Sequence, residues 1–284
     1  MSTFLLTLNY ALMILIPIIV AIFIWRKTRA SWRFFFIGAV TFVASQILHI
    51  PFNFAIQRSG LLPASATTTT NLLIIAAFLG LSSGVFEETA RYLTYRFWAR
   101  DARSWSRGLM LGAGHGGIEA ILLGTLAAVN FFGLLYAANN QMALSVLTPE
   151  QQSQITDTLN GILSTPLPGL LLGAVERLFA IATHLALSVL VLQVFLRRRK
   201  VWLLLAIIWH ALLNMAAVAG AARLGPYATE ALIGAFALAS LFIIFRFRAP
   251  DAVTPEPEPL PPPAAADSLP LQPTDEALDR SRYS

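Results

Sequence analysis

The sequence contains no cysteine. This excludes a disulfide framework, a cysteine-ligated metal and a cysteine nucleophile. Charge is also scarce: Asp, Glu, Lys and Arg make up 12% of the 284 residues, whereas soluble domains carry about 25%. The sequence also lacks an internal repeat, a phosphate-cradling glycine loop and an HExxH motif, so a zincin-type helix is excluded. With 56% hydrophobic residues, the composition is that of a membrane protein.

The sequence instead contains long apolar runs. A membrane-spanning helix needs about 20 mostly apolar residues, and about seven stretches reach that length. They are residues 4–25, 34–55, 71–95, 108–136, 168–196, 201–221 and 227–247. We therefore predict an all-α fold, a polytopic bundle of about seven transmembrane helices whose first run is a retained span.

Basic residues predict the orientation of this bundle. They follow the first, third, fifth and seventh spans, whereas the loops on the opposite side contain only Arg58 and Arg223. Cytoplasmic loops are rich in Lys and Arg, so the N-terminus is predicted outside and the C-terminus in the cytoplasm. The clusters are Arg26, Lys27, Arg29 and Arg33; Arg96, Arg100, Arg103 and Arg107; Arg197, Arg198, Arg199 and Lys200; and Arg246 and Arg248. Because the basic residues stand at span ends, the net charge of +5 does not indicate a nucleic-acid partner.

The bundle is predicted to cover residues 1–248, with a motif core at 84–214. Residues 249–284, rich in Pro, Ala and acid, are predicted to form a disordered cytoplasmic tail because they cannot bury enough apolar surface to fold. Between the fourth and fifth spans, Thr148 followed by Pro149 is typical of a helix start. That loop carries either a short helix along the outer surface or a plain solvated segment.

Ionisable residues inside the apolar spans are the candidate site, because charge in hydrocarbon is costly and usually functional. The third span contains GVFEETARY, with Glu87, Glu88 and Arg91. On a helix Arg91 lies beside both acids. One carboxylate is therefore predicted to pair with Arg91 while the other turns into the bundle. The alternative is that the acids only hold this helix to a neighbour.

The fourth and sixth spans add further polar residues. GAGHGGIEA places His115 and Glu119 one turn apart, and its glycines are predicted to let helices, or a substrate backbone, approach closely. WHALLNM places His210 and Asn214 on one face. This pair suits hydrogen bonding to a developing oxyanion, and His210 also suits a metal. A purely structural His115, bonded across helices, is the alternative.

The fifth span contributes Glu176, Arg177 and His184 in VERLFAIATH. Arg177 and His184 are seven residues apart and share a face. Glu176 and Arg177 form either a structural ion pair or part of the catalytic site. His49, near the outer end of the second span, is interpreted as structural.

Depth in the membrane is a test of whether these groups meet. At about 1.5 Å per residue above the nearest basic cluster, four groups reach a common level in the inner half of the membrane. They are His115 at roughly 12 Å, Glu87 at roughly 14 Å, His210 at roughly 15 Å and His184 at roughly 20 Å. Glu176, at roughly 30 Å, is predicted to lie outside the cluster.

Two chemistries suit such a cluster. Buried glutamate and histidine can activate water by general-base catalysis. Three histidines and a carboxylate can instead hold Zn²⁺ with an open position for water. The residues allow zinc without requiring it. Its ligands would be His115, Glu119, His184 and His210.

Three classes of function are compatible with the residues. The first is an intramembrane endopeptidase, whose partners are the lipid bilayer and a membrane protein or peptide substrate. The second is a proton- or ion-coupled transporter that uses the Glu/His chain as a relay. The third is a non-catalytic scaffold built on a degenerate protease fold. The oligomeric state is left open by the sequence.

The motifs also carry a family resemblance. E-E-x-x-R, then a His in a later span, then H-x-x-x-N resembles the membrane-embedded glutamate-type peptidases, which include the CAAX-processing and bacteriocin-processing endopeptidases and the PrsW proteases. FEETARY, GHGGIEA, the ER…H of the fifth span and HALLN are more similar to the bacterial YhfC family of intramembrane metalloproteases. The resemblance implies a multi-pass protein of the bacterial plasma membrane that uses a metal.

The resemblance also implies residue roles. Glu87 and His115 would activate the water. Glu88 and Arg91 would order the helix that carries them. His210 and Asn214 would form the oxyanion hole. The sequence departs from the CAAX-processing pattern because two residues, not three, separate Glu88 from Arg91. Leu111 also stands where that pattern has a phenylalanine. These departures leave open which of the two adjacent glutamates activates the water.

Overall fold

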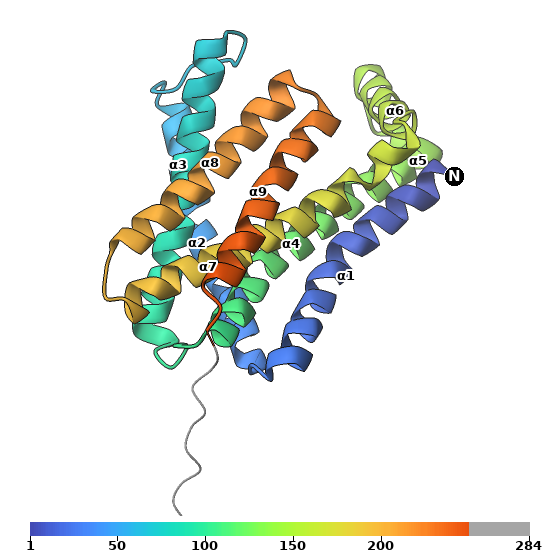
Figure 1. Ribbon diagram of the computed structural model, residues 1–284. Coiled ribbons are helices and arrows are strands. Elements are labelled where there is room, and N and C mark those ends of the chain that lie inside the picture. Colours follow the sequence, from blue (N-terminus) through green and yellow to red (C-terminus); the bar gives the residue numbers. More distant parts are fainter. Residues whose placement is uncertain (250–284) are drawn as a thin grey trace, which may run out of the picture. The chain divides into compact units, whose positions relative to one another are not determined.

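The computed structural model describes residues 1–249, which are helical apart from caps and short connections. Seven helical segments are long and apolar enough to cross a membrane. Their main helices are α1 (Ser2–Thr28), α2 (Trp32–Arg58), α3 (Thr69–Leu93), α4 (Trp105–Asn139), α7 (Leu172–Leu196), α8 (Val201–Arg223) and α9 (Pro226–Arg246) (Figure 1). The predicted all-α bundle and its seven spans are therefore confirmed. The predicted tail lies outside the described residues, apart from residue 249.

Shorter elements connect or extend these helices. A π-helical turn, η1 (Thr94–Trp98), extends α3, and a 3-10 turn, η2 (Leu167–Leu171), precedes α7. Between α4 and η2 lie α5 (Gln141–Ser145) and α6 (Pro149–Leu163). A capping box starts α6: the Thr148 side chain accepts from the Gln151 backbone N–H, and the Gln151 side chain accepts from that of Thr148. The predicted helix at Thr148 is confirmed, and the plain loop is wrong.

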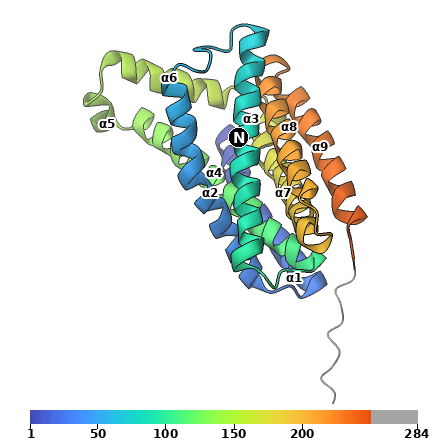
Figure 2. The same ribbon diagram turned by 90° about the vertical axis from the view of Figure 1, so that its left-hand side faces the viewer.

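The helix α7 lies at the centre of the bundle. Every residue from 183 to 194 is buried, which requires neighbours on all sides of the helix. These neighbours include α1, α3, α4, α8 and α9. The helix α3 packs along α8, and α2 packs along α4 (Figure 2). The four helices that carry the predicted site residues, α3, α4, α7 and α8, are thus gathered around one region.

Glycines bring the backbones of α2, α4 and α7 into contact. A Cβ built on Gly114 of α4 would lie 1.8 Å from the carbonyl oxygen of Phe35 on α2, and one on Gly38 of α2 would lie 2.0 Å from a carbonyl oxygen of α4. Toward α7, a Cβ on Gly116 would lie 2.8 Å from the Cβ of His184. The predicted close approach of helices is confirmed. The alternative use, admission of a substrate backbone, is wrong because α2 and α7 occupy that space.

The crossing of α2 and α4 is expected to tolerate no added methyl group. Gly114→Ala should lower the free energy of unfolding by about 1–3 kcal/mol, because the new Cβ must push the two backbones apart. The control is Gly133→Ala on the same helix, where nothing lies within 4 Å of the added methyl. That change should be neutral or stabilising by up to about 1 kcal/mol. Titration of both variants from mixed micelles into SDS measures the effect, and equal effects would contradict the prediction.

Candidate metal centre and active site

The third span sends its two carboxylates in different directions. Glu88 forms an ion pair with Arg91, Nε to Oε2 at 3.0 Å, and both side chains are fully buried. Arg91 also donates to the carbonyl oxygen of His184 at 3.0 Å and to the hydroxyl of Ser188. Glu87 is directed instead toward the histidines of other helices. The prediction that one acid pairs with Arg91 while the other turns into the bundle is confirmed.

Three imidazole rings from three helices meet beside these carboxylates. Nε2 of His115 lies 3.1 Å from Oε2 of Glu87. Nδ1 of His210 lies 2.9 Å from Oε1 of Glu88, and its Nε2 lies 4.0 Å from Oε2 of Glu87. The ring centroid of His184 is 5.1 Å from that of His115 and 5.4 Å from that of His210. The groups predicted to share one depth therefore lie close together in the structure.

Glu119 joins the cluster from α4 through a second set of contacts. Its Oε2 lies 2.7 Å from Nε2 of His184, and its Oε1 accepts from Arg177 at 2.8 Å. Arg177 also pairs with its neighbour Glu176. The predicted shared face of Arg177 and His184 is confirmed by their common partner. The ion pair between Glu176 and Arg177, one of the two alternatives predicted for these residues, is present.

A polar cavity of about 80 Å³ opens at this cluster. It is lined by Glu87, Glu119, Glu176, Arg177, Ala180, Thr183, His184, His210, Leu213, Asn214, Ala217 and Ile233. Asn214 therefore faces the same space as His210, as predicted. Glu176, predicted to lie outside the cluster, also lines this cavity, where its ion-pair partner is Arg177.

The sequence analysis missed one polar residue that contacts Glu87. Gln46 of α2 donates from Nε2 to Oε1 of Glu87 at 3.1 Å. The side-chain oxygen Oε1 of Gln46 lies 3.1 Å from Nδ1 of His49. Nε2 of His49 lies 3.1 Å from the hydroxyl of Ser82. The signal was available, because Gln46, His49 and Asn53 form a polar stripe at helical spacing in an apolar span. His49 is thus a structural residue, as interpreted, but one that supports the partner of Glu87.

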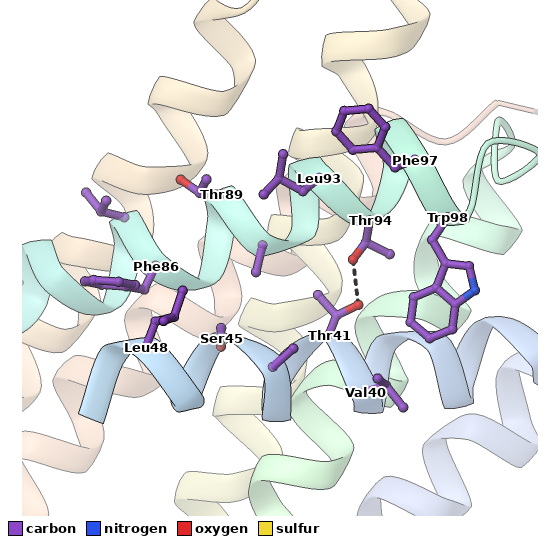
Figure 3. A pocket seen from close by; sticks show the side chains of 13 residues that line it. Val40, Thr41, Ser45, Leu48, Phe86, Thr89, Leu93, Thr94, Phe97 and Trp98 are labelled. Carbon is purple, nitrogen blue, oxygen red and sulfur yellow. Dashed lines mark hydrogen bonds between the residues drawn. The ribbon is translucent and has the colours of Figure 1, made fainter. Parts of the chain in front are cut away.

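A separate apolar groove lies between α2 and α3, extending along η1 (Figure 3). Its volume is about 520 Å³, and its walls carry carbon and a few hydroxyl groups but no ionisable side chain. Thr41 and Thr94 join the two helices across it through their hydroxyls, 2.8 Å apart. Ser45 lines the groove and accepts from Gln46 Nε2 at 3.2 Å. Gln46 thereby stands between this groove and the carboxylate of Glu87.

The clustered side chains suit a metal ion. Glu87, His115 and His184 each offer a ligand atom, and these atoms lie within 4.8 Å of one another at a buried position. Imidazole nitrogen and carboxylate oxygen are the donors that Zn²⁺ takes in proteins without cysteine. His210 is held through Nδ1 by Glu88, which leaves Nε2 directed at Glu87. Such a carboxylate–histidine pair is the usual arrangement behind a metal ligand.

Two further observations bear on the donor set. Nδ1 of His115 is buried without a hydrogen-bond partner among the described residues. Arg91 lies 3.2 Å from Nδ1 of His184, so that ring presents its Nε2–H to Glu119. As a ligand, His184 would exchange this hydrogen bond for the metal. With that exchange, the residues fit a zinc centre.

Comparison with known proteins identifies the family of this arrangement. Residues 12–236 match the family described as YhfC intramembrane metalloprotease. The chain belongs to the YhfC family. It is 35% identical over 215 residues to a Bacillus subtilis (strain 168) protein described as "Uncharacterized membrane protein YhfC", covering 75% of this chain and 83% of that one. No solved structure matches the chain.

The YhfC match begins inside α1 and ends inside α9, so it includes every residue of the Glu/His cluster. It confirms the resemblance to the YhfC family that was inferred from the motifs. Together with the seven apolar helices, it establishes the chain as a multi-pass membrane protein. The YhfC family description names a metalloprotease.

Proposed function

We propose that the chain is an intramembrane endopeptidase that hydrolyses a peptide bond of a membrane-associated protein or peptide, with zinc held at the Glu/His cluster. The observation that carries the proposal is the convergence of buried imidazoles and carboxylates from α3, α4, α7 and α8 on one polar cavity. Ionisable groups in the membrane are expensive and are kept for function. The family description favours a peptidase over the ion-coupled transporter that the sequence also allowed.

In this proposal the zinc ligands are the four predicted from the sequence, His115, His184, His210 and Glu119. His115 and His184 belong to the group whose ligand atoms lie within 4.8 Å of one another, and the third member of that group is Glu87. When bound, the zinc ion would act as a Lewis acid toward the scissile carbonyl and the attacking water. Glu88 positions His210 by accepting from its Nδ1, and Arg91 balances the charge of Glu88. Asn214 lines the same cavity one turn from His210 and is placed to donate a hydrogen bond to the oxyanion.

Glu87 is the general base in this scheme. Its Oε1 is held by Gln46, while its Oε2 lies between His115 and His210. A carboxylate fixed in this way can take a proton from water and return it to the leaving amine. The fixed contact with Gln46 favours Glu87 over Glu88, which is already engaged with Arg91 and His210.

Zinc content of detergent-purified protein tests the proposal. Wild type is expected to contain near-stoichiometric zinc, which His115→Ala and His210→Ala should lose. The matched control is His49→Ala: His49 is equally a buried histidine of the bundle, but it contacts Ser82 and Gln46 and is not one of the cluster residues. Its zinc content should equal that of wild type.

Two results would change the proposal. Zinc-free wild-type protein that still cleaves would assign catalysis to a water activated by Glu87 alone and return His210 to the oxyanion role. Equal zinc in wild type and both cluster variants would show that the metal binds elsewhere and would overturn the zinc centre.

A further inference from the structure

Two cavities adjoin between α7, α8 and α9. The polar cavity of the cluster and a larger one of about 470 Å³ share Glu176, Ala217 and Ile233 as lining residues. The larger cavity also contacts Pro226, the first residue of α9. It therefore lies near the α8–α9 turn, at the end of the bundle away from the last turn of α9 (Figure 1). That end is predicted to face outward, because the basic clusters stand at the other.

The walls of the two cavities are acidic. They contain four carboxylates, Glu87, Glu119, Glu176 and Glu230, against one arginine, Arg177. The charge of Arg177 is already shared between Glu119 and Glu176. A low-dielectric passage whose walls carry an excess of one sign of charge concentrates ions of the opposite sign. This passage therefore favours cations.

Glu230 carries a carboxylate oxygen that lacks a partner within residues 1–249. Its Oε2 is buried and has no hydrogen-bond partner among the described residues. A buried polar atom left in this way is costly, and more so for a carboxylate in a membrane-spanning helix. Glu230 itself lines the larger cavity, so a cation there would meet its carboxylate group.

We infer that the two adjoining cavities form the route by which a divalent cation reaches the Glu/His cluster from the outer end of the bundle, with Glu230 and Glu176 as successive weak ligands. The inference rests on the proposed zinc centre. Glu176 is the step between the cavities, because it lines both. Glu119 follows it, joined to Glu176 through Arg177 and to the cluster through His184.

The groove between α2 and α3 does not offer such a route. Its walls are apolar with scattered hydroxyl groups, as the side chains of Val40, Leu48, Phe86 and Trp98 illustrate (Figure 3). A dehydrated divalent cation has no ligand there that matches the carboxylates of the α7–α9 passage. The groove therefore provides an internal control for access to the cluster.

The rate of zinc binding to stripped, detergent-solubilised full-length protein tests the route. Zn²⁺ is added to protein freed of metal by a chelator, and release from a fluorescent zinc indicator is followed in a stopped-flow instrument. Glu230→Gln is expected to slow binding at least about tenfold, with the final stoichiometry unchanged. Glu150→Gln, an exposed acid on α6, should leave the rate unchanged.

Because the chain has no cysteine, single thiols can block either opening. Ala221→Cys carrying a bulky methanethiosulfonate adduct should slow zinc binding, since Ala221 lines the larger cavity. The same adduct on Val40→Cys, in the apolar groove, should not.

If zinc binds at unchanged rates in Glu230→Gln and in blocked Ala221→Cys, the route is overturned while the zinc centre stands. If the final stoichiometry of Glu230→Gln falls, Glu230 is a resident ligand and the route is also overturned. If wild type binds no zinc, both proposals fail.

Discussion

Replacing Glu87 with glutamine is expected to lower the rate of hydrolysis by about 10³-fold while the protein remains folded, since general-base catalysis typically contributes 10²–10⁴. Glutamine has the same shape and keeps an oxygen that accepts from Gln46. It cannot take a proton from water. The substitution also replaces the partner of His115 by an amide, which changes a hydrogen bond without opening a void.

Cleavage of fluorescent single-span reporter proteins in proteoliposomes, measured beside wild type, gives the rate. Zinc content of the same preparation separates two roles for this residue. If Glu87 is the base, zinc is retained and the rate falls; if it is a ligand, zinc is lost with the rate. Glu150→Gln on α6 is the control. Wild-type cleavage rates in Glu87→Gln would overturn the catalytic assignment.

Removing the guanidinium of Arg91 is expected to cost the most stability of any single change in the site, about 3–5 kcal/mol for breaking one side of a buried ion pair. Arg91→Met leaves Glu88 fully buried without its cation. It also removes the donors to the carbonyl oxygen of His184 and to the hydroxyl of Ser188, so the contact between α3 and α7 is weakened. The loss of stability is expected to come more from the uncompensated charge of Glu88 than from the smaller volume of methionine.

The second half of a double-mutant cycle tests that reason. Adding Glu88→Gln to Arg91→Met removes the stranded charge and should recover a substantial part of the loss, because replacing a buried pair by neutral groups is often well tolerated. Free energies of unfolding come from SDS titration in mixed micelles. Arg100→Met, an exposed position beyond η1, is the control. A double variant as unstable as the sum of its single variants would show that the cost of losing Arg91 does not depend on the charge of Glu88.

The membrane architecture was predictable because length and hydropathy alone decide it. All seven spans were placed correctly, since a run of about 20 apolar residues has few other structures available. The cluster was predictable for a related reason: an ionisable residue in hydrocarbon needs partners, and the partners had to come from other spans. Helical spacing predicted that one of the two glutamates pairs with Arg91 while the other turns away, but not which one; the structure pairs Glu88 with Arg91 and turns Glu87 toward His115.

The remaining features depend on how the helices cross. The contact of Gln46 with Glu87 joins α2 to α3, and no spacing within one helix reveals it. Glu176 lines the cavity because the cavity extends along α7 from His184 to Glu176, which a depth scale for single residues does not include. The α4 glycines were correctly linked to close approach, but which neighbour fills each one follows only from the packing of α2 and α7.

For the proposed peptidase, the backbone contacts of α4 limit which substrates can be cut. His115 stands on a helix whose Gly114 and Gly116 touch α2 and α7 directly, so this part of the wall cannot yield. The cavity beside it is about 80 Å³, whereas an intact α-helix is about 10 Å across. In the proposed function, a substrate span must therefore unwind locally to enter this cavity. Cleavage should occur where glycine, proline or exposure to water has already unwound the substrate helix. Selectivity should then depend on this local unwinding more than on the residues at the cleavage site.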